Sequence, residues 1–210
     1  MTMRTTREVL KDMLEAREIV REYPAGVLRT ATTVDKLLPG IAAFGVGTGL
    51  ACDPWRKLFP IDPIQFVAHN WGNPRMLLKS QKCGGEAGEV FWRRLFDFHD
   101  RAEINLQNTQ TINVLQGIKA GPAAGTMSTD KTFLGECLAY LREQVHIVRP
   151  RLIVTLGEAS AYLCRKANRE HKFGVEIVSI MHPSARARNW AGPYDAWIET
   201  QARTIREALR

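Results

Sequence analysis

Short apolar runs separated by longer amphipathic stretches form the pattern of hydrophobic and polar positions along the chain. Three runs have the length and composition of buried strands, at residues 64–68, 152–156 and 175–180. A further strand is predicted at residues 109–115. The stretches between and after them have the apolar spacing of helices that pack on a sheet. These helices are predicted at about residues 89–98, 131–148, 157–167 and 194–209.

The alternation of strands and helices predicts the fold class and the division of the chain. It favours a three-layer α/β/α fold with a central four-stranded, mainly parallel sheet. Another amphipathic helix is predicted at about residues 4–21, before the first strand. We therefore expect an N-terminal helix and irregular extension, residues 1–60, packed on an α/β domain of residues 61–210. Recruitment of a partner by the N-terminal helix is the alternative.

Polar residues follow three of the predicted strands. His69 and Asn70 come after the first strand, Asn113 lies at the end of the second, and a His-Pro-Ser sequence at residues 182–184 follows the last. In parallel sheets ligands bind at the carboxyl ends of the strands. The sequence therefore predicts a polar site at one edge of the sheet.

Charge makes nucleic acid a reasonable partner. The chain has 210 residues with 29 Lys and Arg against 22 Asp and Glu, a net charge of +7. Residues 142–210 have 12 basic and 7 acidic side chains, a net of +5, so the excess lies mostly in the last third. A basic surface attracts polyanions, because phosphate contacts release condensed counterions.

Cysteine spacing and hydropathy exclude other classes. The four cysteines, at positions 52, 83, 137 and 164, include no close pair, which argues against a zinc or iron–sulfur site. The sequence has neither the apolar run of about 18–20 residues that a membrane span needs nor an apolar signal segment at its start. We expect a cytoplasmic protein without a membrane segment or a metal.

Four motifs occur in order over about residues 60–205. They are the sequence AHNWG at 68–72, the strand end TIN at 111–113, PRLIVTLG at 150–157, and MHPS at 181–184. Together they resemble the motifs of the uracil-DNA glycosylase superfamily. The resemblance implies a DNA glycosylase of base excision repair, which flips a base out of the DNA and hydrolyses the N-glycosidic bond of uracil or a related deaminated or mismatched base. It implies no cofactor, and we expect a monomer that acts on single- or double-stranded DNA.

The resemblance also implies roles for single residues. Asn70 would position the attacking water, and His182 would donate a hydrogen bond to the carbonyl oxygen of the leaving base. Asn113 would bind the Watson–Crick edge of the base, since an amide offers both a donor and an acceptor. Each residue also has a structural interpretation, as a turn residue for Asn70 and Asn113 and as a structural histidine for His182.

The remaining assignments concern the base pocket and the DNA backbone. Trp71 and Phe91 are candidates for stacking on the base, although the aromatic residues at 91–98 also suit the core. Gly72 stands where uracil-specific members have a tyrosine that excludes thymine, so the resemblance implies room for other bases. The predicted phosphate contacts follow the last strand and can also be an ordinary solvated loop: Ser184, Arg186 and Arg188.

Two departures from the family pattern keep other functions open. Trp71 replaces the proline of the first motif, and residues 185–188 (ARAR) lack the apolar wedge that fills the gap left by a flipped base. Both departures favour a non-catalytic nucleic-acid or nucleotide-binding module on the same fold. A third possibility is a doubly wound domain that binds a nucleotide or a small acid at the edge of the sheet.

Overall fold

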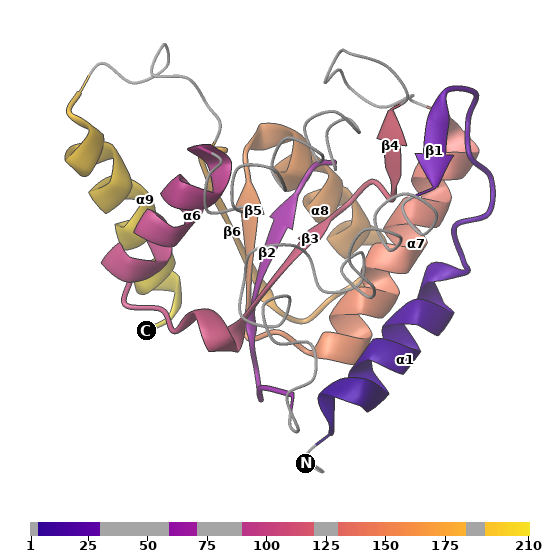
Figure 1. Cartoon of the computed structure of the whole chain (residues 1–210), viewed down its shortest axis with the longest axis horizontal. Helices are drawn as coiled ribbons and strands as arrows, with labels where there is room; N and C mark the ends of the chain where they lie inside the picture. The colour runs from indigo at the N-terminus through magenta and orange to yellow at the C-terminus, as the bar shows by residue number, and fades with distance from the viewer. Residues whose placement is uncertain (1–3, 30–58, 71–89, 120–129, 184–191) are drawn as a thin grey trace.

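A parallel four-stranded sheet forms the centre of the protein. The computed structural model describes residues 4–29, 59–70, 90–119, 130–183 and 192–210. The sheet contains β2 (Ile64–Ala68), β3 (Thr109–Asn113), β5 (Leu152–Leu156) and β6 (Glu176–Ile180), in the order β3-β2-β5-β6 (Figure 1). Each neighbouring pair is parallel. The predicted parallel α/β sheet is confirmed.

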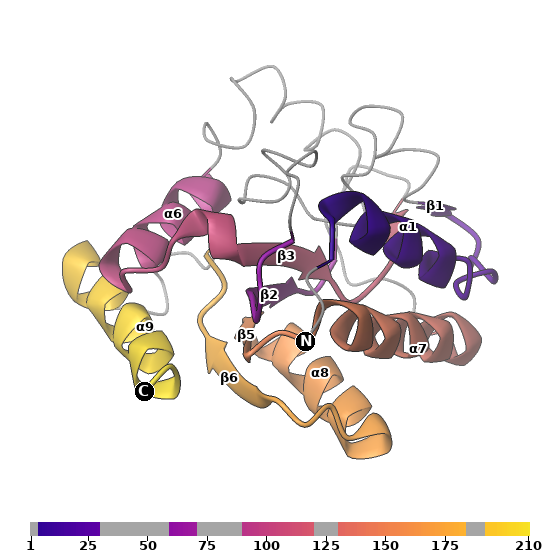
Figure 2. The same ribbon diagram turned by 90° about the horizontal axis from the view of Figure 1, so that it is seen from below.

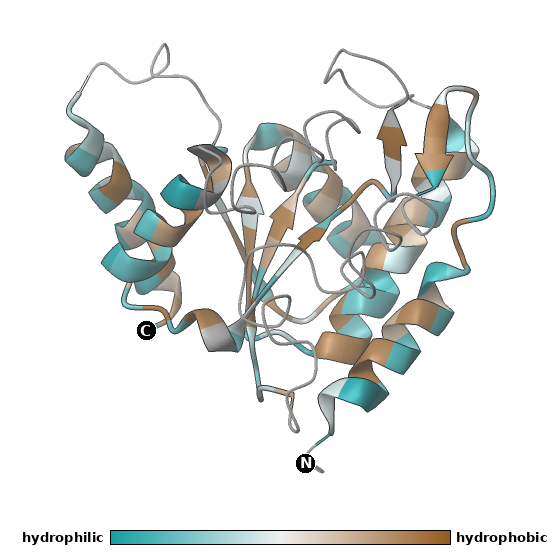
Figure 3. Cartoon of the chain, viewed as in Figure 1, coloured by the Kyte–Doolittle hydropathy of each residue, from teal (hydrophilic) through white to brown (hydrophobic). Residues whose placement is uncertain are grey.

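Helices cover both faces of the sheet, which confirms the three layers. On one face lie α6 (Val90–Arg101) and α9 (Tyr194–Ala208), and on the other lie α7 (Lys131–Val148) and α8 (Glu158–His171) (Figure 2). Side chains alternate between the faces along each strand. Phe66 packs with the buried residues of α6 and α9, whereas Val67 packs with those of α7 and α8. Hydrophobic residues make up most of β2 and β5, and hydrophilic ones recur along the helices (Figure 3).

The N-terminal helix α1 (Thr6–Arg17) lies along α7 (Figure 1). It begins at a capping box between Thr5 and Glu8. Val9 and Met13 are buried in a small cluster with Val148 of α7, and the Tyr140 hydroxyl donates to the Met13 carbonyl oxygen at 3.2 Å. The division of the chain at residue 60 stays a prediction.

Some elements differ from the prediction. β3 ends at Asn113 and not at residue 115, and α1 ends at Arg17 and not near residue 21. Two short strands were not predicted, β1 (Val27–Arg29) and β4 (Gly117–Lys119), which pair antiparallel. Within the described ranges, the helices are all too short or too polar to cross a membrane.

Candidate functional site at the carboxyl edge of the sheet

The strand register brings the ends of the four strands level. Ala68 pairs with Asn113 across β2 and β3, and Leu156 pairs with Ile180 across β5 and β6. Asn113, His69, Asn70 and His182 therefore belong to one edge of the sheet. Of the other predicted site residues, Phe91 lies on α6. Five lie outside the described residues: Trp71, Gly72, Ser184, Arg186 and Arg188.

Hydrogen bonds fix the chain around Asn113. The Val114 amide donates to the Ala68 carbonyl at 2.9 Å, and the Leu115 amide donates to the His69 carbonyl at 3.0 Å. The turn after β3 is thus tied to the turn after β2. The half-buried Asn70 follows at once, so its backbone is held beside the Asn113 turn.

The side chain of Asn113 is a buried amide with an unused acceptor. Its residue is only 8% exposed, and its Oδ1 receives no hydrogen bond from the described residues. Ile112 packs toward α7 and α8 while Ala68, the partner of Asn113, packs toward α6 and α9. Because side chains alternate, Asn113 shares the α6/α9 face of the sheet with Ala68. An unpaired buried acceptor costs about 1–3 kcal/mol.

His182 lies between a glycine and an aromatic ring. Gly157 follows β5 with a φ of +87°, and an ideal Cβ on it would come within 3.0 Å of the His182 Cβ. The ring centroid of Phe91, on α6, lies 5.3 Å from that of His182. Phe91 is half-buried and thus lies next to a predicted catalytic residue on the same face as Asn113.

Two histidines at this edge favour their neutral forms. Burial lowers the pKa of His182 below its usual value of 6.5, and the nearby His69 lowers it further by repelling a second positive charge. Burial also lowers the pKa of His69. At neutral pH the imidazole of His182 is therefore an uncharged hydrogen-bond donor. Sequence reasoning assigned no role to His69, whose effect on His182 depends on tertiary proximity.

The residues on either side of His182 are held by side chains of α6 and α9. The Met181 amide donates to Gln201 Oε1 at 2.8 Å, and Arg94 Nη1 donates to the Pro183 carbonyl oxygen at 2.9 Å. Sequence reasoning missed Arg94, because it lies within an apolar helix pattern and its partner is 89 positions away.

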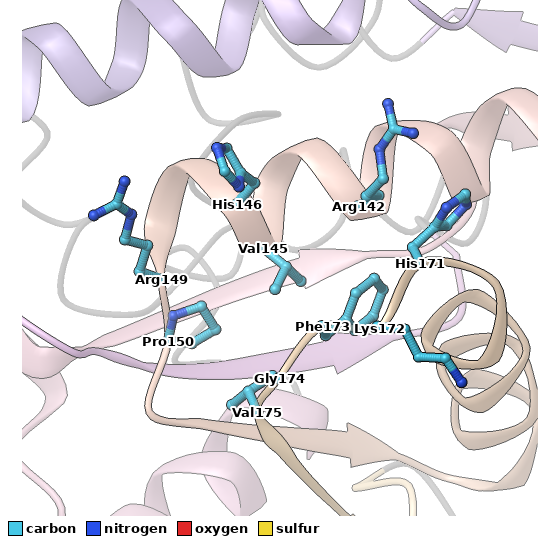
Figure 4. A pocket seen from close by; sticks show the side chains of 10 residues that line it. All are labelled: Arg142, Val145, His146, Arg149, Pro150, His171, Lys172, Phe173, Gly174 and Val175. Carbon is cyan, nitrogen blue, oxygen red and sulfur yellow. The ribbon is translucent and has the colours of Figure 1, made fainter.

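A surface pocket lies at the opposite edge of the sheet. It has a volume of about 260 Å³ and lies between the ends of α7 and α8 and the segment that leads into β6 (Figure 4). Phe173 and Val175 line its apolar part, and Arg142, His146 and Arg149 lie along its rim. It contains none of the predicted site residues. In the part of the chain that the structure describes, no three His, Cys, Asp or Glu side chains are grouped as metal ligands.

The fold and the site together define an α/β domain with neutral amide and imidazole groups at the carboxyl edge of its sheet. Comparison with protein families matches residues 69–206 to the uracil-DNA glycosylase superfamily. The match covers about two thirds of the chain and includes Asn70, Asn113 and His182. The chain belongs to this superfamily, a group of glycosylases that hydrolyse N-glycosyl bonds. None of the curated proteins compared with the chain matches it.

Proposed function

We propose that the protein is a DNA glycosylase that flips a base out of DNA and hydrolyses its N-glycosidic bond, with uracil or a related deaminated or mismatched base as substrate. The observation that carries the proposal is the buried Oδ1 of Asn113, which has no hydrogen-bond partner among the described residues and lies on the same face of the sheet as Phe91, which contacts His182. A buried acceptor of this kind is compensated when a ligand donates to it. The ring N–H groups of uracil, thymine, hypoxanthine and xanthine are such donors.

The spacing of the strands supports a base between Asn113 and His182. Their strands, β3 and β6, are separated by β2 and β5. At about 4.8 Å per strand, the two backbones are about 14 Å apart. Side chains at the two ends of that span can approach a planar base that lies over the edge of the sheet between them.

Chemistry at this edge would then rest on neutral groups placed around developing charge. The departing base becomes an anion, and the sugar gains positive charge. The neutral imidazole of His182 would donate to the carbonyl oxygen of the base, where negative charge grows. Asn70 would orient the water that attacks the sugar, and Phe91 would stack on the base. The net charge of +7 supports DNA as the partner.

A cleavage assay on labelled oligonucleotides tests the proposal. The substrates hold uracil, thymine, hypoxanthine or xanthine opposite guanine, or uracil in a single strand. Wild type is compared with His182→Ala, Asn113→Ala and the matched control His146→Ala, which removes an exposed histidine at the opposite edge. We expect alkali-sensitive breaks with wild type and the control, and loss of cleavage in the other two variants.

The same assay separates the alternatives. Absence of cleavage on every substrate, with DNA binding retained at low salt, would overturn the proposal and leave a non-catalytic binding module. Absence of both cleavage and salt-sensitive DNA binding would show that this edge takes another ligand.

A further inference from the structure

Helix α6 brings two side chains to the turn after β6. Phe91 contacts the His182 ring, with centroids 5.3 Å apart, and Arg94 donates to the carbonyl oxygen of the next residue, Pro183, at 2.9 Å. Residues three apart lie on one face of a helix. The position of α6 therefore determines both contacts at once.

The guanidinium of Arg94 is also held by two rings of α9. Its Cζ lies 5.4 Å from the ring centroid of Trp197 and 5.8 Å from that of Tyr194. Trp197 is buried, and the Tyr194 hydroxyl donates to the Asp97 carboxylate of α6 at 2.5 Å. A planar guanidinium can stack on rings and donate in its own plane at the same time, which an ammonium group cannot do.

Helix α9 fixes the residue that precedes His182. Gln201 accepts a hydrogen bond from the Met181 amide at 2.8 Å, and the Trp197 indole N–H donates to the Met181 sulfur at 3.2 Å. Met181 and Pro183 are thus both anchored by side chains, on the two sides of His182. Arg94 supplies the anchor on the Pro183 side and is itself packed on α9.

We propose that Arg94 is a positioning residue that sets the place of the His182 imidazole through the Pro183 carbonyl, a role that rests on the function proposed above. It does not touch the reacting atoms. A displacement of about 1 Å in a catalytic group can cost about 100-fold in rate. Loss of Arg94 therefore lowers kcat about 10- to 100-fold with little change in KM, because the groups that bind the base and the DNA stay in place.

The experiment compares Arg94→Gln, Arg94→Lys and the matched control Arg93→Gln, whose arginine is exposed on the same helix. For each protein, kcat and KM are measured on the cleaved oligonucleotide, the His182 ring is observed by ¹⁵N NMR, and Tm is recorded. We expect Arg94→Gln to lower kcat and shift the His182 ring signals, and Arg93→Gln to leave both unchanged. We expect Arg94→Lys to keep the positive charge and the fold and still to lower kcat, because a lysine ammonium group cannot stack on the rings of Trp197 and Tyr194 as the planar guanidinium does.

The NMR measurement keeps this inference separate from the proposed function. If wild type cleaves no substrate, the proposed function fails, but the His182 signals still report whether Arg94 sets the imidazole position. Unchanged His182 signals in folded Arg94→Gln and Arg94→Lys would overturn the inference. It is also overturned if kcat falls only in proportion to the unfolded fraction that Tm indicates.

Discussion

Gly157 lies against His182 so closely that an ideal Cβ on the glycine would come within 3.0 Å of the His182 Cβ. The Gly157 amide also donates to the Ile180 carbonyl oxygen at 2.8 Å, so the turn after β5 is bonded to the end of β6. The φ of +87° at Gly157 is one that L side chains rarely adopt. Close approach and backbone conformation both require glycine at this point of the site.

We expect Gly157→Ala to destabilise the protein and to displace His182. The positive φ alone costs about 1–3 kcal/mol, and the new methyl group adds a contact that His182 must relieve. Gly174→Ala is the matched control, because Gly174 has a φ of +68° with open space around it. Urea unfolding should show a larger loss for Gly157→Ala than for Gly174→Ala. Equal losses of stability in the two variants would mean that the contact with His182 does not contribute to the destabilisation.

Asn113→Ala should lower activity by about 100-fold or more with almost no loss of stability. The substitution removes the amide proposed to bind the base, and the scale is that of losing one positioned hydrogen-bonding group. It also removes a buried acceptor that has no partner in the described part of the chain, and the cost of such an acceptor, about 1–3 kcal/mol, offsets the lost packing. Cleavage rates and urea unfolding are compared with Asn108→Ala, an exposed asparagine just before β3. A large loss of stability in Asn113→Ala would indicate a structural role for Asn113.

The sequence predicts the central strands well because their limits are marked locally. The observed bounds of β2 and β5 match the predicted ones, each beginning shortly after a proline (Pro63 and Pro150). The predicted end of β3, at residue 115, is wrong because Val114 and Leu115 are apolar and buried like strand residues. β1 and β4 have three residues each and pair positions about 90 apart in sequence, so no local periodicity marks them.

The candidate site also has residues that the sequence predicts and residues that it does not. The sequence predicts Asn113 and His182 because Asn113 lies at the end of one predicted strand and His182 follows another. Parallel topology brings such strand ends to one edge of the sheet. The effect of His69 on the pKa of His182 and the bond from Arg94 to Pro183 depend on contacts between distant segments. No spacing rule within one element identifies such contacts.

The ring of His182 should titrate below pH 6.5, and its pKa should rise when His69 is removed. Burial is the larger cause of the lowered pKa, and repulsion by His69 is the second. In His69→Gln the second cause disappears, so the pKa of His182 moves back toward 6.5 while staying below it. NMR titration of the ring signals measures this directly, and His171→Gln, a histidine at the end of α8, provides the control. An unchanged titration of His182 in His69→Gln would exclude electrostatic coupling of the two rings.

His99 should make the protein less stable in acid. It is fully buried on α6, its Nδ1 lies 2.6 Å from the Leu95 carbonyl oxygen, and its ring centroid lies 4.5 Å from that of Phe66. Burial lowers its pKa from 6.5 to about 4. Between these two pKa values the unfolded chain binds a proton that the folded chain does not. The free energy of unfolding is therefore at its full value above pH 6.5 and falls as the pH is lowered to about 4, by about 3 kcal/mol in total. Urea unfolding between these pH values should show a shallower decline for His99→Met than for wild type. Equal slopes for the two proteins would show that His99 is protonated in the folded state.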